Sequence, residues 1–203
     1  MTDNATRTRK RLRLLLLIGV FAAPMIAAYA LYYGGWRPAS ARANGELVTP
    51  ARPIADVELK RLDGDALRFS SFQRRWLLLY FGSSECTSAC ERALYNMRQV
   101  IAAQGRETHR VRAAMVITDR RALDMLRYQL KEYPDLMPLE GEAASVAQLA
   151  RQFELPSANP LAGLHRIYVV DPLGNFMMSY PAEADPAGMR KDLTRLLRYS
   201  QVG

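Results

Sequence analysis

The sequence is poor in the residues that bind metals and carry redox chemistry, with two cysteines and two histidines among 203 residues. Two cysteines form at most one disulfide. Three residues separate them, so the chain lacks the Cys-x-x-Cys pair of general thiol-disulfide oxidoreductases, and that activity is disfavoured. The sequence has no internal repeat and no low-complexity tract. Hydrophobic residues make up 49% and charged residues 24% of the chain, which excludes wholesale disorder and a multispan membrane protein.

The net charge of +8 is unevenly distributed along the chain. Five basic residues lie within residues 7–13 and directly precede Leu14–Tyr33, a run of 20 residues without a charge. A helix of this length spans about 30 Å, the thickness of the hydrocarbon core of a bilayer. Because basic residues before a span stay in the cytoplasm, we expect residues 1–13 to be cytoplasmic, residues 14–33 to form a single transmembrane helix, and the rest to be exported. This charge distribution argues against a nucleic-acid partner.

A cleavable signal peptide is the alternative to a membrane anchor, since Ala28–Ala30 resembles a small-x-small cleavage site. The apolar run is longer than a usual signal core and continues past this site, which favours the uncleaved anchor. In both cases the bulk of the chain is exported. The sequence therefore predicts a domain on the periplasmic side of a bacterial inner membrane.

Residues 34–53 are rich in Gly, Pro, Ala and Arg, and are predicted to form a linker between the membrane and a domain at residues 54–203. Within this domain we expect alternating strands and helices. In chain order they are a β-hairpin turning at Asp63-Gly64, a buried strand at Trp76–Phe81, a helix after Cys90, a strand at Arg110–Thr118, a helix ending at Pro134, a helix at Glu142–Leu155, a β-hairpin at His165–Pro181 and a helix from Asp185.

This order of elements predicts an α/β fold, a thioredoxin-like three-layer α/β/α domain behind the N-terminal helix. The segment "GSSECTSACER" places Cys86 and Cys90 at the carboxyl end of the first central strand, where a helix begins. The amide groups and dipole at a helix N-terminus favour a thiolate. The functional end of the sheet is therefore expected at these cysteines.

Cys86 and Cys90 have three possible uses: a working dithiol, a metal site or an inert disulfide. If the helix has already begun at Cys86, their Cβ atoms lie roughly 5–6 Å apart, against about 3.5–4.5 Å in a relaxed disulfide. A disulfide then requires a distorted first turn, whereas a metal ion between two thiolates requires less adjustment. An exported compartment allows a disulfide to persist, but so short a loop gains little stability from it. Glu85 and Glu91 flank the pair and oppose the helix dipole.

A soft metal such as Cu(I) prefers thiolate and thioether ligands, usually completed by His or Met. His165 opens the strand of the C-terminal hairpin, which runs close to the cysteine loop in a thioredoxin-like fold, so it is the better candidate for a third ligand. His109 lies among charged residues and is expected on the surface. Met97, Met177 and Met178 are expected to fill the core.

The segments "LLLYFGSSECTSAC" and "YVVDPLGNF" resemble the Sco/SenC family, membrane-anchored thioredoxin-like proteins that help to assemble the copper centre of cytochrome c oxidase. The resemblance runs from about Asp56 to the C-terminus and includes the N-terminal anchor. It implies a cytochrome c oxidase subunit or another assembly factor as partner, copper as cargo, and Cys86 and Cys90 as the reactive pair.

Two departures from the family concern the site. Family cysteines are usually each followed by proline, whereas Thr87 and Glu91 follow them here. The family's copper-binding histidine falls in register with Gly163, two residues before His165. Two residues along a strand span about 6.6 Å, so His165 lies about that far from the position of the family's histidine. The resemblance therefore implies His165 only as a displaced third ligand.

The leading hypothesis is a membrane-anchored, periplasm-facing assembly factor for cytochrome c oxidase. It uses Cys86 and Cys90 for copper delivery or for thiol redox chemistry. The alternative is a thioredoxin-like binding or scaffold module with a structural disulfide and no metal. The sequence leaves open whether the chain is an enzyme.

Overall fold

The computed structural model describes residues 3–35, 43–62, 64–156, 158–162 and 165–200. The chain divides into two compact units, residues 1–42 and residues 43–203, which are described separately below.

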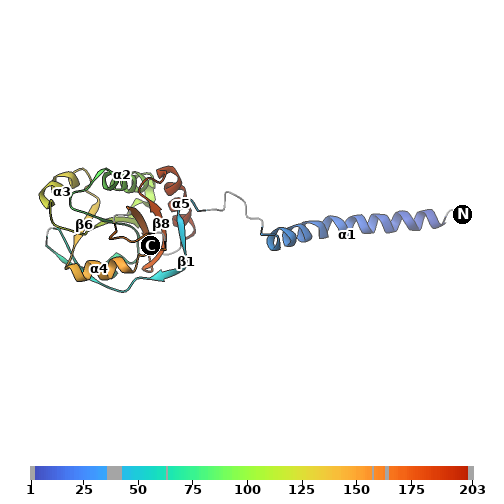
Figure 1. Ribbon diagram of the computed structural model, residues 1–203. Coiled ribbons are helices and arrows are strands. Elements are labelled where there is room, and N and C mark those ends of the chain that lie inside the picture. Colours follow the sequence, from blue (N-terminus) through green and yellow to red (C-terminus); the bar gives the residue numbers. More distant parts are fainter. Residues whose placement is uncertain (1–2, 36–42, 63, 157, 163–164, 201–203) are drawn as a thin grey trace. The chain divides into compact units, whose positions relative to one another are not determined.

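The first unit consists of one long helix, α1 (Asp3–Tyr33) (Figure 1). Its segment Leu15–Tyr33 has a mean hydropathy of 2.1, and none of it is buried. The predicted N-terminal apolar helix is thus confirmed. Its length and composition suit both a membrane span and a signal sequence, so the anchor and the cytoplasmic residues 1–13 remain predictions.

The second unit contains a single eight-stranded sheet with the order β1-β8-β7-β4-β5-β6-β2-β3. β4 pairs in parallel with β5, and β5 in parallel with β6, while the other neighbours pair antiparallel. The strands are β1 (Glu46–Pro53), β2 (Glu58–Arg61), β3 (Ala66–Arg68), β4 (Trp76–Gly82), β5 (Val111–Ile117), β6 (Leu136–Glu140), β7 (Arg166–Val170) and β8 (Asn175–Pro181).

Helices cover both faces of this sheet (Figure 1). All seven residues of β4 are buried, as expected for a central strand packed on both sides. On one face, α2 (Ser88–Ala102), α3 (Leu123–Leu130) and α5 (Pro186–Tyr199) pack on an apolar core, and on the other α4 (Ala143–Arg151) packs on a second core. The thioredoxin-like three-layer α/β/α fold is therefore confirmed.

The predicted linker at residues 34–53 is wrong over its second half, because Glu46–Pro53 forms β1 and pairs with β8 at the edge of the sheet. The compact unit accordingly begins at Ala43 rather than at residue 54. The side chains of β1 are mostly exposed, so the sequence shows no apolar alternation there. Backbone hydrogen bonds, rather than side-chain burial, define this strand.

A second strand missing from the prediction is β6, in which three of five residues are only partly buried and Pro138 interrupts the pattern. Proline lowers strand propensity, which explains the omission. The predicted N-terminal hairpin is confirmed as β2 and β3, with Gly64 at a φ of +107°. Asp63 of that turn lies outside the described residues.

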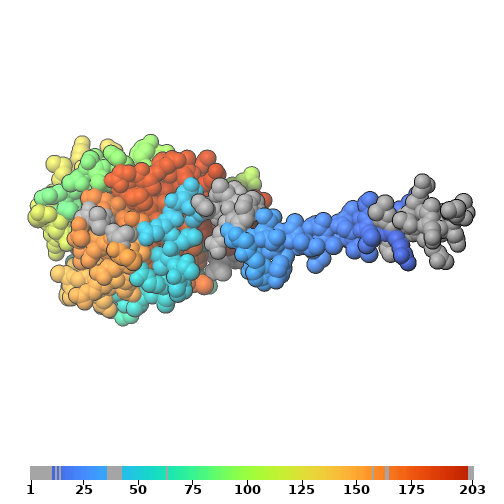
Figure 2. Space-filling model, turned by 45° about the vertical axis from the view of Figure 1, so that its right-hand side comes forward, coloured from blue at the N-terminus to red at the C-terminus, as the bar shows by residue number. Residues whose placement is uncertain are grey.

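β1 and α5 are joined through Asp192, a carboxylate that is only 3% exposed. Asp192 accepts hydrogen bonds from the backbone N–H of Asn44 at 2.7 Å and of Gly45 at 3.3 Å, and from the Tyr180 hydroxyl at 2.9 Å. Figure 2 shows β1 in cyan beside the red α5 at the surface. This contact fixes the start of the domain where the sequence predicted a linker.

Candidate functional site

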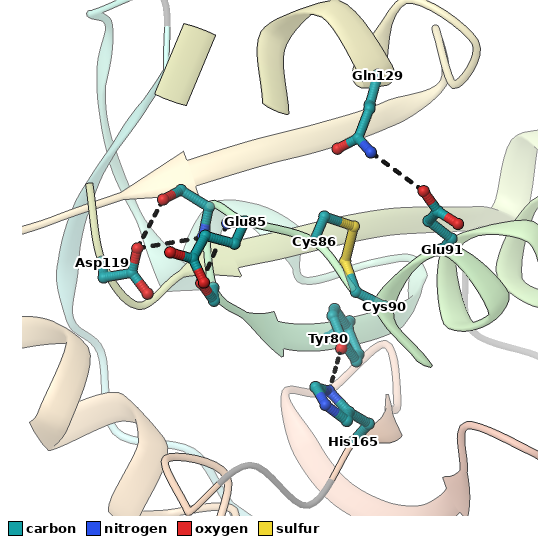
Figure 3. The surroundings of a disulfide bond; sticks show 10 residues. Tyr80, Glu85, Cys86, Cys90, Glu91, Asp119, Gln129 and His165 are labelled. Carbon is teal, nitrogen blue, oxygen red and sulfur yellow. Dashed lines mark hydrogen bonds between the residues drawn. A yellow bond between two sulfur atoms is a disulfide. The ribbon is translucent and has the colours of Figure 1, made fainter. Parts of the chain in front are cut away.

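Cys86 and Cys90 form a disulfide with their Cα atoms 5.1 Å apart, within the usual range for such a bond (Figure 3). α2 begins only at Ser88, after the N-cap residue Thr87, so Cys86 lies in the loop between β4 and the helix. Its backbone has a φ of +32°, outside the helical region. The i, i+4 helical geometry considered above therefore does not apply, and the loop conformation allows the disulfide.

A buried serine and an aspartate hold this loop in place. The Ser84 hydroxyl, which has no exposed surface, donates to Asp119 Oδ1 at 2.6 Å and accepts from the backbone N–H of Ala122 at 2.9 Å. The backbone N–H of Cys86 donates to the carbonyl of Ser83 at 3.2 Å. These contacts join the cysteine loop after β4 to the loop after β5 (Figure 3).

The Asp119 carboxylate is stabilised in its charged form. Partial burial by itself raises the pKa of Asp119, but hydrogen bonds from Ser84, Ser83 and Arg121 outweigh it and bring the pKa well below the ordinary 3.8. Ser84 and Asp119 were not predicted as site residues. Each lies just after one of two neighbouring parallel strands, whose carboxyl ends meet at one edge of the sheet, and that position is a signal the sequence contains.

The disulfide is buried. Cys86 is 4% and Cys90 1% exposed, and both belong to the apolar core beneath α2 together with Tyr80. Met97 and Met178 are buried in the same core and Met177 packs against it, which confirms the methionines as core residues. A partner thiol reaches either sulfur only if the loop or its surroundings open.

The two flanking glutamates lie at the exposed rim of the site. Glu91, in the first turn of α2, accepts a hydrogen bond from Gln129 of α3 at 3.1 Å. Glu85 lies 3.8 Å from Arg121, which also pairs with Asp119. The positive charge of Arg121 therefore offsets part of the negative charge that opposes the helix dipole at Cys86.

His165 lies beside the site but is engaged by a tyrosine. Its Nδ1 is 2.5 Å from the hydroxyl of Tyr80, and the Tyr80 ring lies between Cys90 and His165 (Figure 3). Burial, followed by the charge of Glu183, raises the pKa of Tyr80 well above its ordinary value of 10.0, so the phenol is neutral. His109 is exposed and contacts the Arg106 carbonyl, as predicted. Gly163, the register position of the family histidine, lies outside the described residues.

In its oxidised form, the cysteine site is better suited to thiol-disulfide chemistry than to metal binding. Among the residues that the structure describes, no three His, Cys, Asp or Glu side chains form a group able to hold a metal ion. Both sulfurs are bonded to each other, and Nδ1 of His165 faces Tyr80. Thiolate ligands become available only after two-electron reduction of the disulfide.

Comparison with known families gives two matches. The family described as transmembrane-like, thioredoxin-like, C-terminal domain matches residues 76–200, which is more than half of the chain. The family described as transmembrane-like, N-terminal domain matches residues 5–35. Among curated proteins, none matches this sequence.

Solved structures with a similar fold include copper proteins and thiol oxidoreductases. Copper-bound ScoI of Arabidopsis thaliana is 21% identical with a TM-score of 0.61, covering 72% of this chain and 99% of its own. Apo Sco1 of Thermus thermophilus is 22% identical with a TM-score of 0.63, and the match covers 79% of this chain and 98% of Sco1. The thioredoxin domain of a thiol-disulfide oxidoreductase of Bacteroides vulgatus is 16% identical with a TM-score of 0.57. This match covers 74% of this chain and 99% of that domain. At these identities the similarity establishes the fold alone.

The lowered pKa of Asp119 predicts that the stability of the fold depends on pH. Because its pKa is lower in the folded chain than in the unfolded chain, its stabilising effect is present above the ordinary value of 3.8 and is lost as the pH falls below it. We expect Asp119→Asn to lower the free energy of unfolding by about 1–2 kcal/mol at pH 7. The difference from the wild type should shrink toward pH 2. Denaturant unfolding between pH 2 and 7 measures it.

Asp124→Asn is the matched control, because Asp124 is a fully exposed carboxylate on the neighbouring helix α3. A difference between Asp119→Asn and wild type that stays constant with pH would contradict this role for Asp119.

Proposed function

The chain belongs to the transmembrane-like, thioredoxin-like family, and from this premise we propose that it is a membrane-anchored thiol-disulfide assembly factor for cytochrome c oxidase. The observation that carries the proposal is the Cys86–Cys90 disulfide in the loop between β4 and α2. The resemblance of this segment to Sco/SenC proteins and the fold shared with a member of the Sco family of cytochrome c oxidase assembly proteins support the choice of oxidase as the target.

In the proposed reaction, the reduced cysteine pair reduces a disulfide of the oxidase subunit. The Cys86 thiolate attacks that disulfide and releases one partner thiolate. The Cys90 thiolate then attacks the Cys86 sulfur, releases the second partner thiolate and forms the disulfide seen in this structure. Two electrons and two protons pass to the partner's cysteines. An exported dithiol reductant returns the pair to its reduced form.

Copper is the proposed cargo of the reduced form. Cys86 and Cys90 then supply two thiolates from one loop, and His165 supplies a third donor once it leaves Tyr80. Thiolate and imidazole are donors that Cu(I) accepts. The copper-bound Arabidopsis thaliana ScoI structure supports this cargo through a shared fold.

The proposed location is the bacterial inner membrane. The apolar segment Leu15–Tyr33 follows five basic residues, and this order supports an N-terminus in the cytoplasm and a thioredoxin-like domain in the periplasm. In this oxidising compartment the disulfide persists until a dedicated reductant acts on it.

A scaffold module with a structural disulfide is the second candidate. The burial of Cys86 and Cys90, at 4% and 1% exposure, favours it because working dithiols usually expose one sulfur. Such a module would recognise an oxidase subunit through its surface and leave the cysteines unchanged.

Replacement of Cys90 tests the proposed reaction. Without the Cys90 thiol, a mixed disulfide between Cys86 and the target has no internal thiol to resolve it. We expect full-length Cys90→Ser, produced in cells that make the oxidase, to accumulate a reductant-sensitive adduct that contains an oxidase subunit. Non-reducing electrophoresis and mass spectrometry identify the adduct.

The double variant Cys86→Ser, Cys90→Ser is the control and should form no adduct. If Cys90→Ser also forms none while the oxidase is made normally, the scaffold module is favoured instead.

Copper titration of the reduced full-length chain tests the proposed cargo. We expect one Cu(I) per chain, no binding in Cys86→Ser, and affinity at least about tenfold weaker in His165→Ala. His109→Ala, at an exposed histidine, should bind as the wild type does. Competition with a Cu(I) chelator measures the affinity, and unchanged binding by His165→Ala would remove this residue from the site.

A further inference from the structure

The end of the domain opposite the cysteines carries a cluster of positive charge. β4 ends at Gly82, just before the cysteine loop, and begins at Trp76, where β5 also begins. Around the beginnings of these strands lie six exposed cationic side chains, here called the basic face. They are Arg61, Arg74, Arg75, Arg112, Arg127 and Lys131.

Two hollows of about 710 and 920 Å³ open on the basic face. Arg61, Arg112 and Met137 line both of them, so they form one continuous depression. Arg127 and Lys131 line the first, and Arg74 and Arg75 line the second. The cations come from separate elements and converge on a hollowed surface.

Few negative charges of the described residues neutralise this face. Among those residues, the acidic ones that line the hollows are Asp65 and Asp135, both exposed. Within the described part of the chain, Arg127 alone of the six cations forms an ion pair, with Asp124 at 3.2 Å. Like charges gathered in this way repel one another, so the face favours an anionic ligand.

An apolar hollow of about 200 Å³ adjoins the first basic hollow. The two share the segment Tyr133–Leu136, and the apolar hollow is lined mainly by carbon-rich side chains of α2, with Ala113 of β5. A ligand with a phosphate next to an apolar part suits this neighbourhood better than a free phosphate does, because a free phosphate leaves the apolar hollow empty.

We propose that the basic face docks the domain on a bilayer by binding the phosphates of anionic phospholipids. This inference rests on the membrane anchoring proposed above. Nine residues lie between Tyr33, where α1 ends, and Ala43, where the domain starts, and the ten residue steps from Tyr33 to Ala43 span at most about 36 Å when fully extended. The tether joins the domain at the start of β1, which lies at the cysteine end of the sheet, and its reach exceeds the roughly 23 Å length of β4. The basic face at the other end therefore still reaches the headgroups, and even a weak electrostatic contact is populated.

Spread-out cations suit an array of headgroups. The basic face covers two hollows rather than one enclosed cavity, and its arginines can each contact a different phosphate. The cysteine pair lies at the other end of β4, so docking through the basic face leaves Cys86 and Cys90 away from the headgroups.

Hydrogen exchange of the full-length chain in nanodiscs tests this docking. We expect amides of the segment from Lys131 to Pro138 to exchange about fivefold more slowly in discs containing phosphatidylglycerol than in discs of phosphatidylcholine alone. The difference should disappear in about 1 M salt, where the Debye length is about 3 Å. Amides of α4 should exchange alike in both discs.

Charge reversal with a matched control completes the test. The variant Arg61→Glu, Arg112→Glu should lose the slower exchange, whereas Arg190→Glu, Lys191→Glu, with the same change of net charge at exposed positions of α5, should retain it. Equal exchange in both discs, or loss of the effect in the control pair, would overturn the proposal. The proposal would also be overturned if inorganic pyrophosphate, added to phosphatidylcholine discs, slowed amide exchange as much as phosphatidylglycerol does, because the ligand would then be a soluble one.

The failure of docking is distinguishable from failure of the proposed function. A chain that enters neither disc overturns the anchoring, and the docking with it. Slower exchange in anionic discs together with no mixed disulfide from Cys90→Ser would support the docking and contradict the thiol chemistry alone.

Discussion

The parallel pairing of β4 with β5 brings the cysteine loop and Asp119 to the same edge of the sheet. There the Ser84 hydroxyl donates to Asp119 and accepts from the Ala122 amide, which fixes the chain just before Cys86. The helix then begins only at Ser88, and Cys86 stays in the loop, close enough to Cys90 for a disulfide. Any change in that loop therefore alters the geometry of both sulfurs.

Much of the fold follows from local patterns in the sequence. The apolar run Trp76–Phe81 and the Asp-Pro-x-Gly turn at Asp171–Gly174 identify a central strand and a hairpin without reference to the rest of the chain. β1 and β6 escaped prediction because β1 is mostly exposed and β6 contains Pro138. Both are defined by pairing with distant strands, which no local periodicity records.

The sequence predicts the two cysteines of the candidate site, but it predicts less of their surroundings. Cys86 and Cys90 follow directly from spacing and strand order, but the spacing alone assumes a helix that in fact starts two residues later than Cys86. The contact between Tyr80 and His165 joins residues 85 positions apart and depends on the register of β4 with β7. Long-range register of this kind is set by the packed sheet, not by a motif.

The central claim is that the Cys86–Cys90 disulfide is a working bond despite its burial. The most direct measurement is its reduction potential in the full-length chain, from thiol labelling in graded dithiothreitol redox buffers. A working pair should have a potential above roughly −300 mV. A lower potential would mark the bond as structural and contradict the account.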